Sequence, residues 1–259
     1  MVELRDNDDA FAYGDALLVG DRVRLRGTRE SDLPALAAAM MDPAIRVTQS
    51  HTATPLSEAT ARSLIGEWSA SKNGADVGFS VETLADDPEL VGHVGLFGIG
   101  VKDRCGTVGI MLVRAQVGRG YGTDAMRLIV GFGFREVGLH RIQLGVYSFN
   151  PRAIAAYRKA GFVEEGRLRE MFFRGGRWHD DVKMGLLARE YQAQAAALRV
   201  EVFVADLDAF VDFYTRVLGF DLSDDRRHCV PICTQFRVTV QFGFPKTQPD
   251  LAFHILKTR

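Results

Sequence analysis

The sequence predicts an α+β protein with two domains, and three observations support this expectation. The 259 residues are enough for two domains by the usual relation between length and domain number. Between residues 77 and 113, short runs of alternating apolar residues are separated by turns, which is typical of antiparallel strands. Helical runs that end at glycine flank this region, and a new strand pattern begins after an alanine-rich stretch at 188–197. We therefore expect a mixed, mainly antiparallel central sheet flanked by helices, followed by a small βαβββ module.

The first quarter of the chain is predicted to form one strand and two helices. The strand is RVRLR at residues 22–26, in which apolar and basic residues alternate. The first helix spans residues 34–41, because Asp32 can cap its start and Asp42-Pro43 stops it. A polar loop is expected over residues 44–55, with His51 as a solvated loop residue, and a second helix over residues 57–70.

The middle of the chain is predicted to hold the rest of the main sheet. The expected elements are strands at residues 77–83, 90–99, 107–113 and 141–147, helices at 123–137 and from Asn150-Pro151 to Gly161, and a hairpin over 172–187 that turns at Gly175-Gly176. The helix at 123–137 has apolar residues on more than one face, which suits a helix packed on a sheet.

These elements divide the chain into an N-terminal arm (residues 1–20), a main domain (21–190), a linker (191–197) and a terminal module (198–259). The linker belongs to a helix-prone stretch, AREYQAQAAA, at residues 188–197. In the module, strands are expected at 198–204, 220–222, 236–244 and 251–256, with a helix at 207–218.

Composition excludes several classes of protein. The net charge of -1 gives no broad electrostatic case for binding nucleic acid. The three cysteines are too few for a disulfide framework, which favours a reduced, cytoplasmic setting. No stretch is apolar for long enough to span a membrane, so no membrane partner is expected. Cys229 and Cys233 lie near His228, but four ligands at zinc spacing are missing, and no metal is predicted.

A glycine-rich turn is the strongest sign of a ligand site. Its glycines, Gly118, Gly120 and Gly122, lie between the strand ending at 113 and the helix starting at 123. Their backbone amides and the first amides of the helix can cradle phosphate, and Arg119 adds a basic group. The spacing differs from both the Walker and the Rossmann phosphate loops.

Three stretches around this turn resemble one family. They are VGRGYGTDAM, GLHRIQLGVYSFNPRAIAAYRKAGFVEEGRLRE and GRWHDDVKMGLL. In this order they are similar to the GNAT N-acetyltransferases, and more closely to the branch that acetylates ribosomal-protein alanine and spermidine. The resemblance covers about residues 20–190 and implies the GNAT fold and acetyl-CoA as cosubstrate.

The resemblance also implies roles for particular residues. Asn150 contacts the cofactor and Tyr157 is the general acid, whereas Val117 departs from the family by replacing a Gln or Arg. The backbone positions implied are Gly118, Arg119, Gly120, Tyr121, Gly122 and Thr123 for the pyrophosphate, and Met111 and Val113 for the pantetheine arm.

The chemistry of amine acetylation adds two requirements. The developing oxyanion needs a donor, for which the backbone amide near Leu112 is a candidate, and the leaving thiolate needs a proton, which a tyrosine can supply. A base is harder to place, because members of this branch often carry a glutamate on the strand at 107–113, which has none here. Possible substitutes are Glu82, His93 and Asp103, while His179 and Asp180 either line the pocket or bind backbone.

The terminal module resembles a second family. LRVEVFVADLDAFVDFYTRVLGF is similar to the start of a vicinal-oxygen-chelate module of glyoxalase and bleomycin-resistance proteins. The metal histidine of that family falls at Arg199, so no metal is expected there. Because a lone module leaves a sheet edge and an apolar face uncovered, we expect a homodimer formed through the modules.

Together these features predict an N-acetyltransferase that transfers acetyl directly from acetyl-CoA to a small amine, such as an antibiotic or a polyamine. Two alternatives stay open: acetylation of a protein N-terminus, and a non-catalytic sensor that binds acetyl-CoA or a drug.

Overall fold

In the computed structural model, the chain forms two compact units, residues 1–188 and 189–259. The structure describes residues 4–50, 52, 54–70 and 76–197, together with five strands of the second unit. Among these residues, no helix is both long and apolar enough to cross a membrane.

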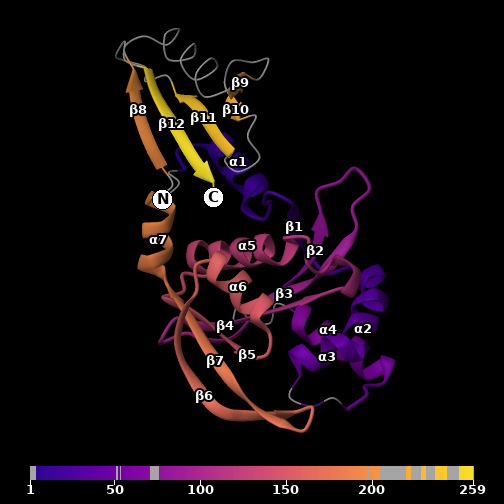
Figure 1. Cartoon of the computed structure of the whole chain (residues 1–259). Helices are drawn as coiled ribbons and strands as arrows, with labels where there is room; N and C mark the ends of the chain where they lie inside the picture. The colour runs from indigo at the N-terminus through magenta and orange to yellow at the C-terminus, as the bar shows by residue number, and fades with distance from the viewer. Residues whose placement is uncertain are drawn as a thin grey trace. The chain divides into compact units, whose positions relative to one another are not determined.

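The first unit is built on a seven-stranded sheet in the order β1-β2-β3-β4-β5-β7-β6 (Figure 1). Its strands are β1 Val23–Arg26, β2 Val77–Thr83, β3 Leu90–Gly100, β4 Cys105–Leu112, β5 Arg141–Tyr147, β6 Val163–Arg174 and β7 Arg177–Leu187. All neighbours are antiparallel except β4 and β5, which are parallel. The predicted α+β class with a mainly antiparallel sheet is therefore confirmed.

The parallel pair of β4 and β5 opens a gap in the middle of the sheet. The two strands pair only over their first residues, Cys105–Thr107 with Arg141–Gln143. Beyond this point β4 continues to Leu112 and β5 to Tyr147 without pairing to each other. Backbone groups along the two inner edges of the gap are therefore available to a ligand.

Helices cover both faces of this sheet, and the alternation of strand side chains tells the two faces apart. Helix α5 (Tyr121–Arg135) packs Gly133 against the side chains of Leu96 and Ile142, and Gly122 against Leu112. Even-numbered residues of β3, β4 and β5 therefore face α5, and odd-numbered ones face the other way. Helices on or near the two faces are α2 Leu33–Met41, α3 Pro43–Gln49, α4 Glu58–Ser69 and α6 Pro151–Lys159.

The odd-numbered face is covered by α2, α3 and α4. Met111 of β4 is buried in one cluster with Leu36 and Met40 of α2, Ile45 of α3 and Ile65 of α4. Apolar side chains at these positions thus anchor the three helices to the sheet beside the gap.

Two segments differ from the sequence prediction. Residues 44–55 were expected to be a polar loop, but α3 occupies 43–49, because the Asp42 carboxylate accepts the amide of Ala44 at 2.8 Å and Pro43 fits the first turn. The same Asp-Pro pair that ends α2 therefore also starts α3. Within the expected N-terminal arm, Asn7–Leu17 form helix α1, capped by Asp6.

The second unit contains five described strands, β8 Arg199–Val204, β9 Phe220–Leu222, β10 Cys229–Pro231, β11 Arg237–Gly243 and β12 Leu251–Thr258. Strands β11, β12 and β8 form one antiparallel sheet, and β9 pairs with β10. Helix α7 (Ala188–Ala197) matches the predicted helical stretch, whereas the helix expected at 207–218 and residues His228 and Cys233 lie outside the described residues.

Candidate active site

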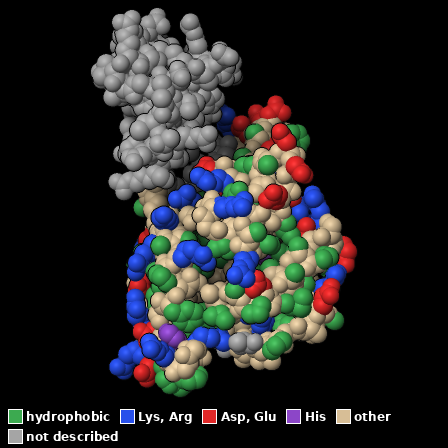
Figure 2. Space-filling view, turned by 45° about the vertical axis from the view of Figure 1, so that its right-hand side comes forward, with side chains coloured by type: hydrophobic (Ala, Val, Ile, Leu, Met, Phe, Trp, Pro, Cys, Tyr) green, Lys and Arg blue, Asp and Glu red, His purple; other side chains and the backbone are tan. Residues whose placement is uncertain are grey.

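A cavity of about 740 Å³ runs through the sheet at the gap between β4 and β5. Residues from both faces line it: Gly118, Gly120, Asn150 and Tyr157 belong to the α5–α6 side, whereas Gln49, His93, Tyr147 and Asp181 belong to the α3–α4 side. On the face of the first unit seen in Figure 2, basic side chains lie around the middle and acidic ones mostly at the rim. Because residues from both faces of the sheet line the cavity, it can admit two ligands from opposite faces.

The glycine-rich turn forms an anion-binding end of this cavity. Gly118 and Gly120 have φ values of 87° and 86°, in the left-handed region that other residues avoid. In this described segment, the N–H groups of residues 118–122 donate to no backbone acceptor. Thr123, by contrast, already donates to the carbonyl of Gly120 at 3.2 Å. Free amides at the start of a 15-residue helix are suited to phosphate.

Two residues that the sequence analysis did not select hold this turn in place. The buried carboxylate of Asp124 accepts the backbone N–H groups of Arg22 and Val23, at 2.8 and 3.1 Å. The Arg22 guanidinium donates to the carbonyl of Arg119 at 3.1 Å. Asp124 thereby ties the start of α5 to β1, and Arg22 adds a positive charge beside the turn. Neither set of hydrogen bonds could be predicted from the sequence, because both depend on β1 lying beside the glycine-rich turn in the fold.

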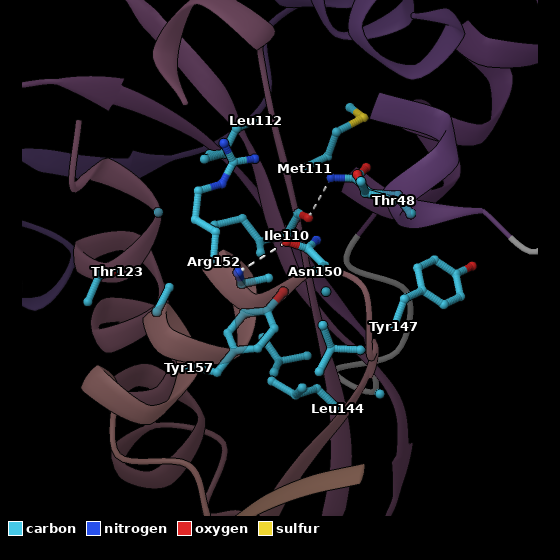
Figure 3. A pocket seen from close by; sticks show the side chains of 18 of the residues that line it. Thr48, Ile110, Met111, Leu112, Thr123, Leu144, Tyr147, Asn150, Arg152 and Tyr157 are labelled. Atoms are coloured by element: carbon cyan, nitrogen blue, oxygen red, sulfur yellow. Dashed lines mark hydrogen bonds between the residues drawn. The ribbon is translucent and has the colours of Figure 1, made fainter. Parts of the chain in front are cut away.

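The inner edge of β4 presents two residues to the gap. The Val113 N–H donates to the Val91 carbonyl at 2.9 Å, so Val113 turns its backbone toward β3. Because this direction alternates along an antiparallel strand, Met111 also faces β3, while Ile110 and Leu112 face the gap. The Ile110 carbonyl accepts a hydrogen bond from the Gln49 side chain at 3.1 Å (Figure 3). Of the three strand positions selected from the sequence, the backbone of Leu112 is the one that faces the gap.

Helix α6 brings Asn150 and Tyr157 to the cavity. Asn150 caps the helix, with its side-chain oxygen accepting the N–H of Ala153 at 3.2 Å, which leaves its amide nitrogen for a ligand. The Tyr157 hydroxyl points into the cavity, toward the side where Asn150 lies (Figure 3). Burial raises the pKa of Tyr157 to about 12, so the hydroxyl keeps its proton at neutral pH.

The opposite side of the cavity holds a carboxylate that the sequence analysis missed. Asp181 of β7 pairs with Tyr147 of β5 across the two strands, and its side chain is 7% exposed. Its Oδ2 lies 2.5 Å from Nζ of Lys183. The carboxylate fills the space above Gly145, where an added Cβ would lie only 2.8 Å from Oδ1. Glycine at 145 is therefore what allows Asp181 to lie at the cavity wall.

The residues considered as a base lie in different surroundings. Glu82 is buried in ion pairs with Arg24 and Arg26, and Asp103 lies in an exposed turn, so neither lines the cavity. His93 does line it, with Nε2 at 3.0 Å from the Ser69 hydroxyl. Burial lowers the pKa of His93 to about 4, so the ring is neutral at pH 7 and a weak proton acceptor.

The two hairpin residues bond to backbone. A ring nitrogen of His179 lies 3.2 Å from the carbonyl of Arg174, and a carboxylate oxygen of Asp180 accepts the N–H of Glu170 at 3.1 Å. Among the described residues, no group of three or more His, Cys, Asp or Glu side chains is arranged to hold a metal ion. A metal-free reaction stays a prediction.

Comparison with known proteins defines the class to which this fold and site belong. The family model "Acetyltransferase (GNAT) domain" matches residues 22–163, more than half of the chain, so the chain belongs to the GNAT acetyltransferases. A second model, for the Glyoxalase/Bleomycin resistance protein/Dioxygenase superfamily, matches residues 196–254. Both resemblances noted from the sequence are thus confirmed.

Two relatives each match about two fifths of the chain. The probable N-acetyltransferase YjcK of Bacillus subtilis is 37% identical over 111 residues, 42% of this chain and 60% of that protein. The spermidine N(1)-acetyltransferase of Vibrio cholerae is 34% identical over 102 residues, 39% of this chain and 59% of that protein. The chain thus spans about 60% of the length of these two relatives.

A solved structure extends this likeness to the whole of a related protein. It is a spermidine N-acetyltransferase from Vibrio cholerae in complex with CoA and spermine, 27% identical with a TM-score of 0.59. The match covers 66% of this chain and 98% of that one. The likeness therefore extends over nearly the whole length of that protein.

Proposed function

We propose that the protein is an acetyl-CoA-dependent N-acetyltransferase that acts on the primary amine of a small molecule by direct transfer. The observation that carries the proposal is the cavity through the sheet, with unpaired amides at one end and a half-buried, protonated tyrosine beside the gap. The relatives named as spermidine acetyltransferases, and the related structure that holds CoA and spermine, support both the cosubstrate and a small amine acceptor.

The chain's own residues suggest how each part of the reaction is served. The amides of residues 118–122 and the basic group of Arg22 fit the pyrophosphate. The inner edge of β4 fits an amide-bearing arm, because Ile110 and Leu112 turn their backbone toward the gap. Here the N–H of Leu112 can donate to the carbonyl oxygen as negative charge develops on it.

Acetyl-CoA supplies an acetyl thioester: the amine nitrogen forms a bond to the carbonyl carbon and the carbon–sulfur bond breaks. Tyr157 holds a proton that can pass to the leaving sulfur, and the attacking nitrogen gives up a proton to water. The two proton movements balance once the tyrosine regains its proton from water. Only an amine that has lost its extra proton reacts, so the neutral fraction in solution can supply the substrate without a strong base.

A panel of acceptors tests this proposal. Small amines, polyamines and peptides with free N-termini would each be mixed with acetyl-CoA, and thiol release measured together with acetyl-CoA affinity by calorimetry. Turnover of small amines is expected. Preference for peptides would instead favour a protein N-terminal acetyltransferase, and tight acetyl-CoA binding without any turnover would favour a sensor.

A further inference from the structure

The part of the cavity on the α3–α4 face differs in chemistry from the part beside the glycine-rich turn. We term it the acceptor chamber and define it by its lining residues Trp68, His93, Phe97, Tyr147, Phe172 and Asp181. The strand register places these side chains together: His93 and Phe97 lie opposite Met111 and Thr107 on the odd-numbered face. Tyr147 and Asp181 pair on the same face. The acceptor chamber is thus separated from α5 and α6 by the sheet itself.

Aromatic rings form two walls of the acceptor chamber. Trp68 of α4 and Phe97 of β3 lie with ring centroids 6.2 Å apart. On the other wall, Tyr147 of β5 and Phe172 of β6 are in edge-to-face contact at 4.4 Å. Such surfaces bind flat apolar groups by burial and ring contact, and they attract an ammonium group through their electron-rich faces.

The charged side chains that line the cavity favour a ligand that carries few positive charges. Among the described residues that line it, Asp181 is the only acidic one, and the basic ones are Arg152, Lys159 and Lys183. Lys183 already offsets part of the charge of Asp181, at 2.5 Å. A chain with several ammonium groups would meet one carboxylate among the described lining residues, so the attraction of the rings alone would have to offset the loss of hydration of the other ammonium groups.

From this geometry, and resting on the proposed acetyl transfer, we propose that the acceptor is an amine with a single positive charge and an aromatic body. Asp181 binds its ammonium group at the wall of the acceptor chamber, the aromatic rings hold its body, and the nitrogen gives its extra proton to water before it attacks the thioester. An extended polyamine is a poor fit, although relatives of this chain are named for spermidine. Asp181 is a specificity-determining residue in this arrangement, since its buried carboxylate distinguishes an ammonium from a neutral group.

The test uses the full chain with 2-phenylethylamine, spermidine and 2-phenylethanol as probes. Acetyl transfer to the two amines is followed by thiol release, and binding of 2-phenylethylamine and of the neutral alcohol to the CoA-saturated protein is followed by calorimetry. The kcat/KM for 2-phenylethylamine should exceed that for spermidine at least about tenfold. Asp181→Asn should weaken binding of the amine roughly 10- to 100-fold and leave binding of the alcohol unchanged.

Two further variants separate this role from a merely structural one. Asp180→Asn is the matched control, because Asp180 bonds to the backbone of Glu170 and does not line the cavity, and its amine binding should equal that of the wild type. Lys183→Met removes the competing cation and should tighten binding of 2-phenylethylamine. It also keeps the proposal testable if Asp181→Asn does not fold.

The outcomes distinguish this inference from the proposed function. Preference for spermidine, no binding of 2-phenylethylamine, or unchanged amine binding in Asp181→Asn would overturn the inference while leaving acetyl transfer intact. If 2-phenylethylamine binds through Asp181 but no amine is acetylated, the ligand class stands and the proposed acetyl transfer fails.

Discussion

At the scale of single residues, burial shifts the pKa values of two titratable rings in the cavity, Tyr157 and His93, in opposite directions. Tyr157 keeps its proton because its pKa rises to about 12, and His93 stays without one because its pKa falls to about 4. In both cases the neutral form is favoured, since burial penalises charge of either sign. The cavity therefore offers a proton donor on one side of the sheet and an uncharged ring on the other.

Replacing Tyr157 by Phe should lower kcat by about 10²- to 10³-fold, because the proton donor is lost while the ring stays in place. Acetyl-CoA affinity, measured by calorimetry, should change little. Tyr13→Phe on α1 removes a tyrosine hydroxyl far along the sequence and serves as a control with normal kcat. A Tyr157→Phe enzyme with full turnover would exclude this residue as the acid.

The pKa of Tyr157 also predicts a pH profile. With a pKa of about 12, the hydroxyl stays protonated well above the ordinary value of about 10. The kcat of the wild type should therefore not fall between pH 8 and 10 through loss of this proton. A decline in kcat with an apparent pKa near 9 that disappears in Tyr157→Phe would contradict this expectation.

His93 should make the fold sensitive to acid. Its pKa is about 4 when folded and about 6.5 when unfolded, so the unfolded chain binds the proton first. The stability that depends on neutral His93 is complete above pH 6.5 and is lost as the pH falls from 6.5 toward 4. The cost is about 2 kcal/mol at pH 5. Urea unfolding at pH 7.5 and 5 should show a smaller loss in His93→Gln than in the wild type; equal losses would refute the assignment.

At the scale of elements, the glycine-rich turn combines an unusual backbone with unpaired amides. Gly120→Ala places a Cβ on a residue with φ of 86°, which costs about 1–2 kcal/mol and favours rotation of the amides out of the cradle. We expect the KM for acetyl-CoA to rise about tenfold or more, with a smaller effect on kcat. Gly66→Ala at an exposed position of α4 is the control, since nothing lies within 4 Å of the added Cβ. It should stabilise the fold by about 0.5–1 kcal/mol.

The elements also show what the sequence could and could not predict. Strand alternation, glycine stops and caps are local, and they correctly placed β2, β5, α2, α5 and α7. Asp42-Pro43 predicts the end of α2, but the local pattern does not reveal that the same residues also start α3. The lining of the gap between β4 and β5 depends on the register of the strands around it. Whether Asp180 or Asp181 faces the cavity follows from the pairing of Tyr147 with Asp181, which no local pattern contains.

At the scale of the whole molecule, the two units raise the question of what the second contributes. Its match to the glyoxalase superfamily covers only residues 196–254, and its β8, β12 and β11 form a three-stranded sheet. Sheets of three strands are near the lower limit of independent stability and commonly gain stability by packing against another element. This supports our expectation that two chains join through this unit.

Shortening the chain after Tyr191 tests that expectation without touching the cavity, whose described lining lies entirely within residues 45–183. Light scattering coupled to size exclusion should show a dimer for the full chain and a monomer for the shorter one. Acetyl-CoA affinity and kcat should stay within about twofold, because distant, independent changes rarely couple. A shorter chain that remains dimeric would move the interface to the first unit. Loss of acetyl transfer in a folded monomer would instead mean that the second unit contributes to the reaction, since every described residue lining the cavity is retained.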